Sequence, residues 1–447
     1  MKRESAPAPH TPVDESAMGD GPAIARSAPL CVIGLSWLTM FFDGFDLVMF
    51  GTVIPGLLNS EPWGLTTTTV GVISSLALVG MIIGALVVGT LSNVVGRRWC
   101  ALGSMLIFSA MMGLAVLAPS PEILGLTRFL AGIGLGGAMP TVSALTLEYT
   151  RPARRNFFFT LMFSGYSIGG VAAALIAIPV LPTFGWRAMF AIGALPLITL
   201  LPLTWRYLPE STSFLRSKGR HDEAGRLLAD LHLHPETLEA ASETYDEGDK
   251  QRAPVSELFR DGRTGRTVTL WAAMFCALLL IYGLTTWIPE IMRGSGYPLG
   301  SALFVLVAFN VGAAVGAVIG GQVADRYGTR TVLLVAFGAA ALTLAALSFR
   351  LPLAVNLLLI AVAGFGSIGT ANLMNVFVTA FYPARSHATA LGWALGVGRI
   401  GAVAGPLIGG LLLATGLGSA SSFYLFCVVA VLGAIAVAVV PRSQPES

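Results

Sequence analysis

The stretch MFFDGFDLVMF, residues 40–50, places two carboxylates inside an otherwise apolar segment. Asp43 and Asp46 are three positions apart, so on a helix they share one face. Ionisable side chains are costly inside a bilayer, and where they occur they usually bind substrate or carry protons. Burial favours the neutral form of a carboxyl group and a nearby guanidinium favours the charged form, so a mobile arginine could switch these acids.

Such an arginine is available at a matching depth. Arg128 lies in an apolar run over residues 122–148, roughly 9 Å from its start, and Asp43 lies roughly 20 Å into residues 30–58, at 1.5 Å per residue. If the two segments run in opposite directions, Arg128 can meet Asp43 or Asp46. We interpret the three residues as a proton-coupling site. The alternative is a static ion pair that holds two helices together.

A second buried cation, Arg399, lies roughly 17 Å into its apolar segment. A guanidinium at that depth suits a substrate carboxylate, which it can bind through two parallel hydrogen bonds. The alternative is an internal partner for a buried acid. Amide and aromatic side chains that could line the same cavity, or equally pack and hydrogen-bond between helices, are Asn310, Asn372, Tyr282 and Trp393.

The composition of the chain predicts the helices that position these residues. The chain has 447 residues, of which 55% are hydrophobic and 11% charged, and its mean hydropathy is +0.76. Soluble domains carry about 25% charged residues. Continuous apolar runs of membrane-spanning length predict an all-α membrane protein and exclude a β-barrel. Twelve transmembrane helices are expected, near 30–58, 70–92, 100–118, 122–148, 157–183, 187–205, 267–291, 301–324, 331–349, 353–381, 388–415 and 420–440.

The arginines and lysines indicate the orientation of these helices. They concentrate in the tails, the central loop and alternate short loops, whereas the opposite loops are nearly bare. By the positive-inside rule, both termini are cytoplasmic. The expected domains are a disordered N-terminal tail, a six-helix bundle, a central cytoplasmic loop, a second six-helix bundle and a C-terminal tail, over residues 1–29, 30–205, 206–266, 267–440 and 441–447.

The two halves of the sequence resemble each other. GTLSNVVGRR begins at Gly89 and GQVADRYGTR at Gly321, which lies 232 positions later. The same offset relates AGIG at Ala131 to AGFG at Ala363. Parallel six-helix repeats are typical of secondary transporters that bind substrate between the halves and rock around it. We therefore expect two pseudo-symmetric bundles in one chain and a monomeric functional unit.

Other chemistry finds no support in the sequence. The four cysteines and five histidines form no metal-binding cluster, so neither a metal nor a cofactor is expected. There is no Walker motif or nucleophile elbow, which argues against an ATP-driven pump or an enzyme. The segment GIGLGG at Gly132 lies within an apolar run, where glycines serve close helix packing. The arginine clusters follow from topology and do not indicate nucleic-acid binding.

Taken together, the motifs resemble a known family. GTLSNVVGRR and GQVADRYGTR resemble the loop signatures of the major facilitator superfamily, and DGFD resembles the hallmark of its aromatic acid:proton symporter branch. RFLAGIGLGGAMP, LPESTSFL and FYPARSHATALGWALGVGRIGAVAGPLIGG are similar to that branch too. The resemblance implies proton-coupled import of benzoate or hydroxybenzoate across a bacterial inner membrane. A symporter for non-aromatic acids, an efflux antiporter for hydrophobic compounds, and a receptor without net flux remain alternatives.

The resemblance also assigns roles to individual residues. Asp43 and Asp46 match the carboxylates that the family needs for transport, and Arg128 and Arg399 match other charges important to it. At one position the chain departs from the pattern, because Asn93 stands where the first loop signature normally carries an acid. The residues expected to gate the cytoplasmic face are Asn93, Gly96, Arg97, Glu148, Asp325, Arg326 and Arg385. Charged groups such as Glu148 and Asp325 are expected to form ion pairs that lock this face, and solvated surface pairs are the alternative.

Overall fold

A computed structural model describes residues 23–59, 63–150, 154–230, 254–260, 263–349, 351–383 and 386–440. Every regular element within these ranges is a helix. Residues 1–22 of the expected N-terminal tail, the expected C-terminal tail and parts of the central loop lie outside the described residues. The first helix begins at Ala23, seven positions before the predicted start.

The first half of the chain contains helices α1 to α8. Their bounds are α1 Ala23–Leu58, α2 Thr67–Val95, α3 Arg97–Val116, α4 Pro121–Glu148, α5 Arg155–Gly193, α6 Leu200–Tyr207, α7 Thr212–Ser217 and α8 His221–Asp230. The second half contains α10 Thr264–Gly294, α11 Leu299–Tyr327, α12 Thr329–Ala346, α13 Leu353–Gly364, a π-helix Phe365–Gly369, α14 Thr370–Thr379, α15 His387–Ala414 and α16 Ser419–Val439. Short 3₁₀ turns cover Leu195–Leu197 and Val255–Phe259.

Eleven stretches of the described chain are long and apolar enough to cross a membrane, whereas twelve were predicted. The difference arises at the fifth and sixth predicted helices, which form one stretch of 51 residues, Phe157–Tyr207. A straight helix of that length would extend roughly 76 Å, more than twice the apolar thickness of a bilayer. Gly185, with φ +73° and ψ 179°, breaks the helix where the two predicted segments were separated.

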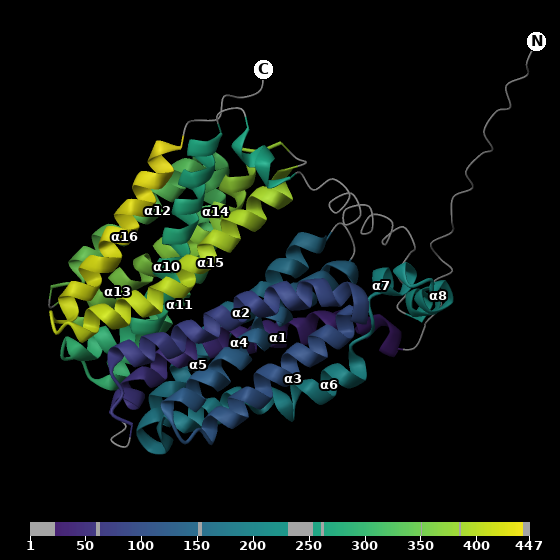
Figure 1. The fold of residues 1–447 in the computed structure, drawn as a ribbon, viewed down its shortest axis with the longest axis horizontal. Coiled ribbons are helices and arrows are strands. Elements are labelled where there is room, and N and C mark those ends of the chain that lie inside the picture. The colour runs from purple at the N-terminus through teal and green to yellow at the C-terminus, as the bar shows by residue number, and fades with distance from the viewer. Residues whose placement is uncertain are drawn as a thin grey trace, which may run out of the picture.

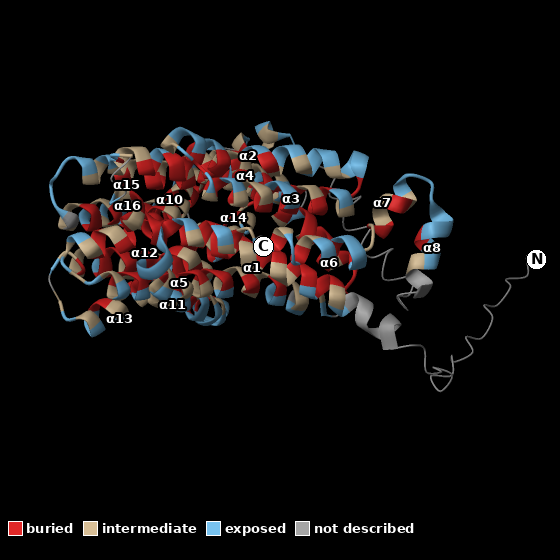
Figure 2. Cartoon of the chain, turned by 90° about the horizontal axis from the view of Figure 1, so that it is seen from below, coloured by how far each residue is buried: buried red, intermediate tan, exposed pale blue. Residues whose placement is uncertain are grey.

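The helices pack as two groups (Figure 1). In the first, α1 packs on α5, and α4 packs on both α2 and α3. In the second, α10 packs on α15 and α16, and α11 packs on α13. Apolar side chains on the outer faces, such as Leu86 and Leu342, are 67% and 75% exposed. The buried residues fill the interior of each group (Figure 2). An apolar exterior around a packed interior is the arrangement expected of helices in lipid.

Equivalent close contacts in the two groups confirm the internal repeat. A Cβ added to Gly132 on α4 would lie 2.0 Å from the carbonyl oxygen of Ala77 on α2. Gly364 and Phe309 lie 232 positions later, and a Cβ on Gly364 would lie 2.1 Å from the Phe309 carbonyl oxygen. Only glycine permits helix backbones to approach this closely. The pseudo-symmetry read from the sequence is therefore present in the packing.

The two groups touch each other through α1 and α10, α2 and α15, and α5 and α11. Gly51 near the end of α1 lies against the backbone of Thr285. The Thr67 hydroxyl, at the start of α2, donates to the carbonyl of Gly410 at 3.0 Å. These contacts lie where α1 ends and α2 begins, while the groups diverge toward the end that carries α7 and α8 (Figure 1).

Candidate functional site

Asp46 on α1 and Arg128 on α4 form a buried ion pair. Arg128 Nη1 donates to Asp46 Oδ1, and Arg128 Nη2 donates to Asp46 Oδ2 at 3.1 Å. Asp46 is 2% exposed and Arg128 is 3% exposed. The structure thus brings together two residues that the sequence predicted to lie at similar depths in the membrane. The contact is bidentate, which is the strong geometry for a guanidinium and a carboxylate.

The surroundings of Arg128 explain why it stays on Asp46. Its guanidinium carbon lies 4.8 Å from the centroid of the Phe50 ring, a cation–π contact. Arg128 Nη1 also approaches the sulfur of Met112 at 3.7 Å. Its Nε is buried and has no hydrogen-bond partner among the described residues. Asp46 is therefore the main source of compensation for this buried cation.

Asp43 has a different environment, although it lies on the same helix face. It is 3% exposed, and within the described part of the chain it forms no hydrogen bond or ion pair. The charged groups that act on it electrostatically are Asp46 and Arg399. Gly44 allows α5 to pack closely here, because a Cβ at Gly44 would lie 1.9 Å from the Tyr166 carbonyl oxygen. Of the two neighbouring acids, Asp46 is therefore compensated by an ion pair and Asp43 is not, among the described residues.

A small cavity adjoins both acids. The space open to the centres of water molecules is about 20 Å³, which accommodates roughly one water molecule. Sites that hold a small organic ligand are much larger, about 300–1,000 Å³. The helices are thus closed around the acids, and a ligand of benzoate size requires them to separate. The cavity is lined by Asp43, Asp46, Leu47, Phe50, Ser74, Ala77, Leu78, Met81, Arg128, Leu135, Tyr166 and Thr286.

The second half of the chain brings Arg399 to the edge of this cavity. Arg399 on α15 is half-buried, and its Nη1 donates to the carbonyl of Met81 on α2 at 3.4 Å. That bond is long and leaves most of the guanidinium donors available. Tyr282 on α10 is half-buried and interacts with both Arg399 and Tyr166. Charged and phenolic groups from both halves therefore converge beside Asp43.

None of the five predicted substrate-binding residues is among those that line the cavity: Arg399 and Tyr282 lie beside it, and the other three make contacts elsewhere. Asn310 is buried at the contact between α5 and α11, where its amide nitrogen donates to the Leu306 carbonyl at 2.9 Å. Trp393 is 47% exposed and stacks on Trp271 with ring centroids 5.8 Å apart. Asn372 is exposed. Hydropathy predicts the depth of a residue in the membrane, but not the direction in which its side chain points.

Two hydroxyl residues of the cavity were not identified from the sequence. Ser74 on α2 and Thr286 on α10 face each other across the two halves, with their oxygens 3.4 Å apart. Serine and threonine are common in membrane helices, where they usually hydrogen-bond their own backbone. No spacing or composition signal separates these two from the others.

The loop residues form a second polar site at the end that carries α7. Gly96 connects α2 and α3 with φ +107°, and Gly328 connects α11 and α12 with φ +85°, a conformation that favours glycine. Arg97 Nη1 donates to Glu148 Oε2 at 3.0 Å. The buried Glu148 carboxylate also accepts bonds from the Ser211 hydroxyl at 2.8 Å, the Ser213 amide at 2.7 Å and the Thr212 hydroxyl.

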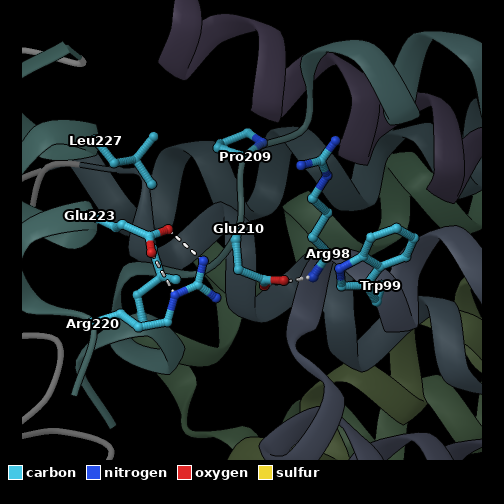
Figure 3. A pocket seen from close by; sticks show the side chains of 8 residues that line it. Arg98, Trp99, Pro209, Glu210, Arg220, Glu223 and Leu227 are labelled. Atoms are coloured by element: carbon cyan, nitrogen blue, oxygen red, sulfur yellow. Dashed lines mark hydrogen bonds and ion pairs between the residues drawn. The ribbon is translucent and has the colours of Figure 1, made fainter. Parts of the chain in front are cut away.

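Glu210 supplies a second carboxylate to this loop site. Its Oε1 accepts the backbone N–H groups of Arg98 and Ser211, each at 2.9 Å. The acid thus lies at the N-terminus of α3, where a negative charge is favourable. Figure 3 shows Glu210 bonded to Arg98 on one side of a surface hollow of about 320 Å³, with the Arg220–Glu223 ion pair on the other side.

Three of the remaining predicted loop residues have a different environment. Asn93, Asp325 and Arg326 are exposed, and Asp325 and Arg326 make no hydrogen bond or ion pair with another residue that the structure describes. Arg385 lies outside the described residues. In the first half, the carboxylates of the loop site therefore come from the end of α4 and from Glu210, rather than from the position that Asn93 occupies. Glu210 was part of a quoted motif but was not singled out from the sequence.

Comparison with known proteins is consistent with this architecture. The chain is 36% identical over 416 residues to a benzoate transport protein of Acinetobacter baylyi, covering 91% of this chain and 88% of that protein. It is 38% identical over 420 residues to a gentisate transporter of Corynebacterium glutamicum, with 93% and 88% covered. It is also 33% identical over 390 residues to the 4-hydroxybenzoate transporter PcaK of Pseudomonas putida, with 86% of each covered.

Solved structures share the fold at lower sequence identity. The inward-open conformation of the xylose transporter XylE from E. coli matches with a TM-score of 0.75 at 17% identity, over 94% of this chain and 98% of that one. The nucleoside transporter NupG matches with a TM-score of 0.70 at 15% identity, over 93% and 100%. Residues 36–402 and 304–447 match the family description Major Facilitator Superfamily. The repeated helical bundles, the glycine-linked loops and these similarities together establish that the chain belongs to the Major Facilitator Superfamily.

Proposed function

We propose that this protein imports aromatic carboxylic acids of the benzoate and hydroxybenzoate class, together with protons, across a bacterial inner membrane. Relatives that are 33–38% identical are named for benzoate, gentisate and 4-hydroxybenzoate transport. The observation that supports proton coupling is the contrast between two neighbouring acids. Asp46 forms an ion pair with Arg128, whereas Asp43 is buried without an ion pair among the described residues.

In this proposal, Asp43 carries the proton and Asp46 anchors Arg128. A carboxyl group that has no partner is much less costly to bury neutral than charged. Proton binding at Asp43 therefore allows the helices to close around the cavity, and opening to water allows release. Asp46 keeps its charge throughout, because the bidentate Arg128 contact compensates it.

Arg399 binds the substrate carboxylate. Its single long bond to the Met81 carbonyl is easily replaced by the stronger pairing that a carboxylate offers. Benzoate-type acids are anions at neutral pH, and moving one negative charge inward against the membrane potential costs about 2.3 kcal/mol per 100 mV. Co-transport of one proton cancels this charge, and further protons would add driving force.

Alternating access follows from where the two halves touch. With both termini cytoplasmic, as the arginine distribution favours, the contacts of Gly51 and Thr67 close the periplasmic end. The cavity would then open toward the cytoplasm when the helices separate at the other end. The Arg97–Glu148 pair ties α3 and α4 together at that end, and we assign it a role in gating.

The proposal is tested by uptake of labelled benzoate and 4-hydroxybenzoate into proteoliposomes with an imposed pH difference. Asp43→Asn should abolish accumulation, because the site can no longer bind and release a proton. Asp222→Asn removes an exposed acid on α8 and serves as the matched control with normal uptake. Gradient-dependent accumulation by Asp43→Asn would refute the proton role. Uptake of dicarboxylates or dyes instead of benzoates, or binding without accumulation, would refute the assigned function.

A further inference from the structure

The hydroxyl pair of Ser74 and Thr286 lies in the cavity beside Asp43 and Asp46. Ser74 is 7% exposed and belongs to the first half of the chain; Thr286 is 5% exposed and belongs to the second. Their oxygens are 3.4 Å apart, at the long limit of a hydrogen bond. The pair therefore joins the two halves through a weak contact inside the cavity.

The arrangement of these hydroxyls differs from that of buried threonines whose hydroxyls are occupied by their own helix. Thr39 and Thr141 donate to the backbone carbonyl four residues earlier, at 2.8 and 2.7 Å. Among the described residues, neither Ser74 nor Thr286 makes such a bond, and each has only the other as a partner. Hydroxyls with one long bond between them retain most of their capacity to donate and accept. They are thus available to a polar group that enters the cavity.

We propose that Ser74 and Thr286 determine specificity by binding a ring hydroxyl of the transported aromatic acid, at the position para to its carboxylate. This inference rests on the proposed function. A phenol can donate one hydrogen bond and accept another, so it can replace the single weak Ser74–Thr286 contact with two normal bonds. Because the two residues come from different halves, a bound hydroxyl would be held by both halves at once.

The position of Arg399 indicates why the para hydroxyl is favoured. Arg399 contacts the carbonyl of Met81, which lies seven residues after Ser74 on the same face of α2, roughly 10 Å away along the helix. The terminal oxygens of a benzoate with a para hydroxyl lie about 6.5 Å apart, so with a hydrogen bond of about 3 Å at either end the molecule bridges roughly 12–13 Å, which is this rise plus the reach of a side chain. Between them, Ala77 and Leu78 provide an apolar wall for the ring. A hydroxyl next to the carboxylate would not reach Ser74.

The test compares the affinities of purified protein for benzoate, 4-hydroxybenzoate and 2-hydroxybenzoate. The wild-type protein should bind 4-hydroxybenzoate more tightly than the other two acids. In Ser74→Ala and in Thr286→Val, the preference for 4-hydroxybenzoate over benzoate should fall about fivefold or more, the equivalent of one lost hydrogen bond. Benzoate affinity should change little, and this also shows that each variant is folded.

Ser75→Ala is the matched control. Ser75 is the next residue on α2, is equally buried at 6%, and donates to the Val403 carbonyl across the two halves at 2.7 Å, but it does not line the cavity. Its loss should leave the ratio of the two affinities unchanged. An unchanged ratio in both Ser74→Ala and Thr286→Val would overturn the inference while leaving the proposed function intact. Failure of the wild-type protein to bind any of the three acids would overturn both.

Discussion

Neutralising Asp46 should destabilise the protein far more than neutralising Asp43, although the two acids lie three residues apart. Asp46→Asn removes the carboxylate that accepts two N–H groups of Arg128. The guanidinium then stays buried with its Nε already unpaired and only Phe50 and Met112 beside it. Leaving one charge of a buried pair uncompensated costs about 3–5 kcal/mol.

Asp43→Asn should instead abolish transport without lowering the stability of the protein. Asp43 has no ion pair to lose within the described chain, and whenever it is ionised its charge repels that of Asp46. Asp43→Asn, which is always neutral, is expected to leave stability unchanged or slightly increased, even though transport is lost. The double variant Asp46→Asn with Arg128→Met should recover most of the stability of the wild type, since no unpaired charge remains.

The assay is the free energy of unfolding in mixed micelles, followed by tryptophan fluorescence. The five proteins are the wild type, Asp43→Asn, Asp46→Asn, Arg128→Met and the double variant, and the last three form a double-mutant cycle with the wild type. A coupling energy of about 3 kcal/mol between Asp46 and Arg128 is expected. A stability of Asp46→Asn equal to that of the wild type would refute the reasoning. So would a double variant that is no more stable than Asp46→Asn alone.

Two further predictions concern packing and the loop site. Gly44→Ala should prevent folding, because its Cβ would lie 1.9 Å from the Tyr166 carbonyl oxygen, whereas Gly103→Ala, with open space around it, should behave as wild type in size-exclusion chromatography. Glu148→Gln should lower the free energy of unfolding by about 2 kcal/mol, because a neutral amide satisfies fewer of the donors that surround the buried carboxylate. Glu223→Gln, in an exposed pair with Arg220 at the start of α8, should cause no measurable change in the same unfolding assay.

Much of the fold could be predicted from the sequence because a bilayer imposes strict conditions. Each crossing needs about 20 apolar residues with all backbone groups bonded internally, so hydropathy locates the helices. The repeat offset seen at Gly89 and Gly321 reappears in the equivalent packing of Gly132 and Gly364. The same conditions identified the ionisable residues within apolar runs as functional candidates, because a charge in the bilayer is costly. These residues are Asp43, Asp46, Arg128 and Arg399.

The sequence by itself determined the class of protein, the depth of its buried charges and the presence of two related halves. Only the tertiary structure decided which acid Arg128 binds, because Asp43 and Asp46 share a depth and a helix face and differ only in their neighbours. It also brought Ser74 and Thr286 together and directed Asn310 away from the cavity. Depth follows from position along a helix, whereas partners depend on how helices rotate and pack, and rotation is settled by contacts between distant parts of the chain.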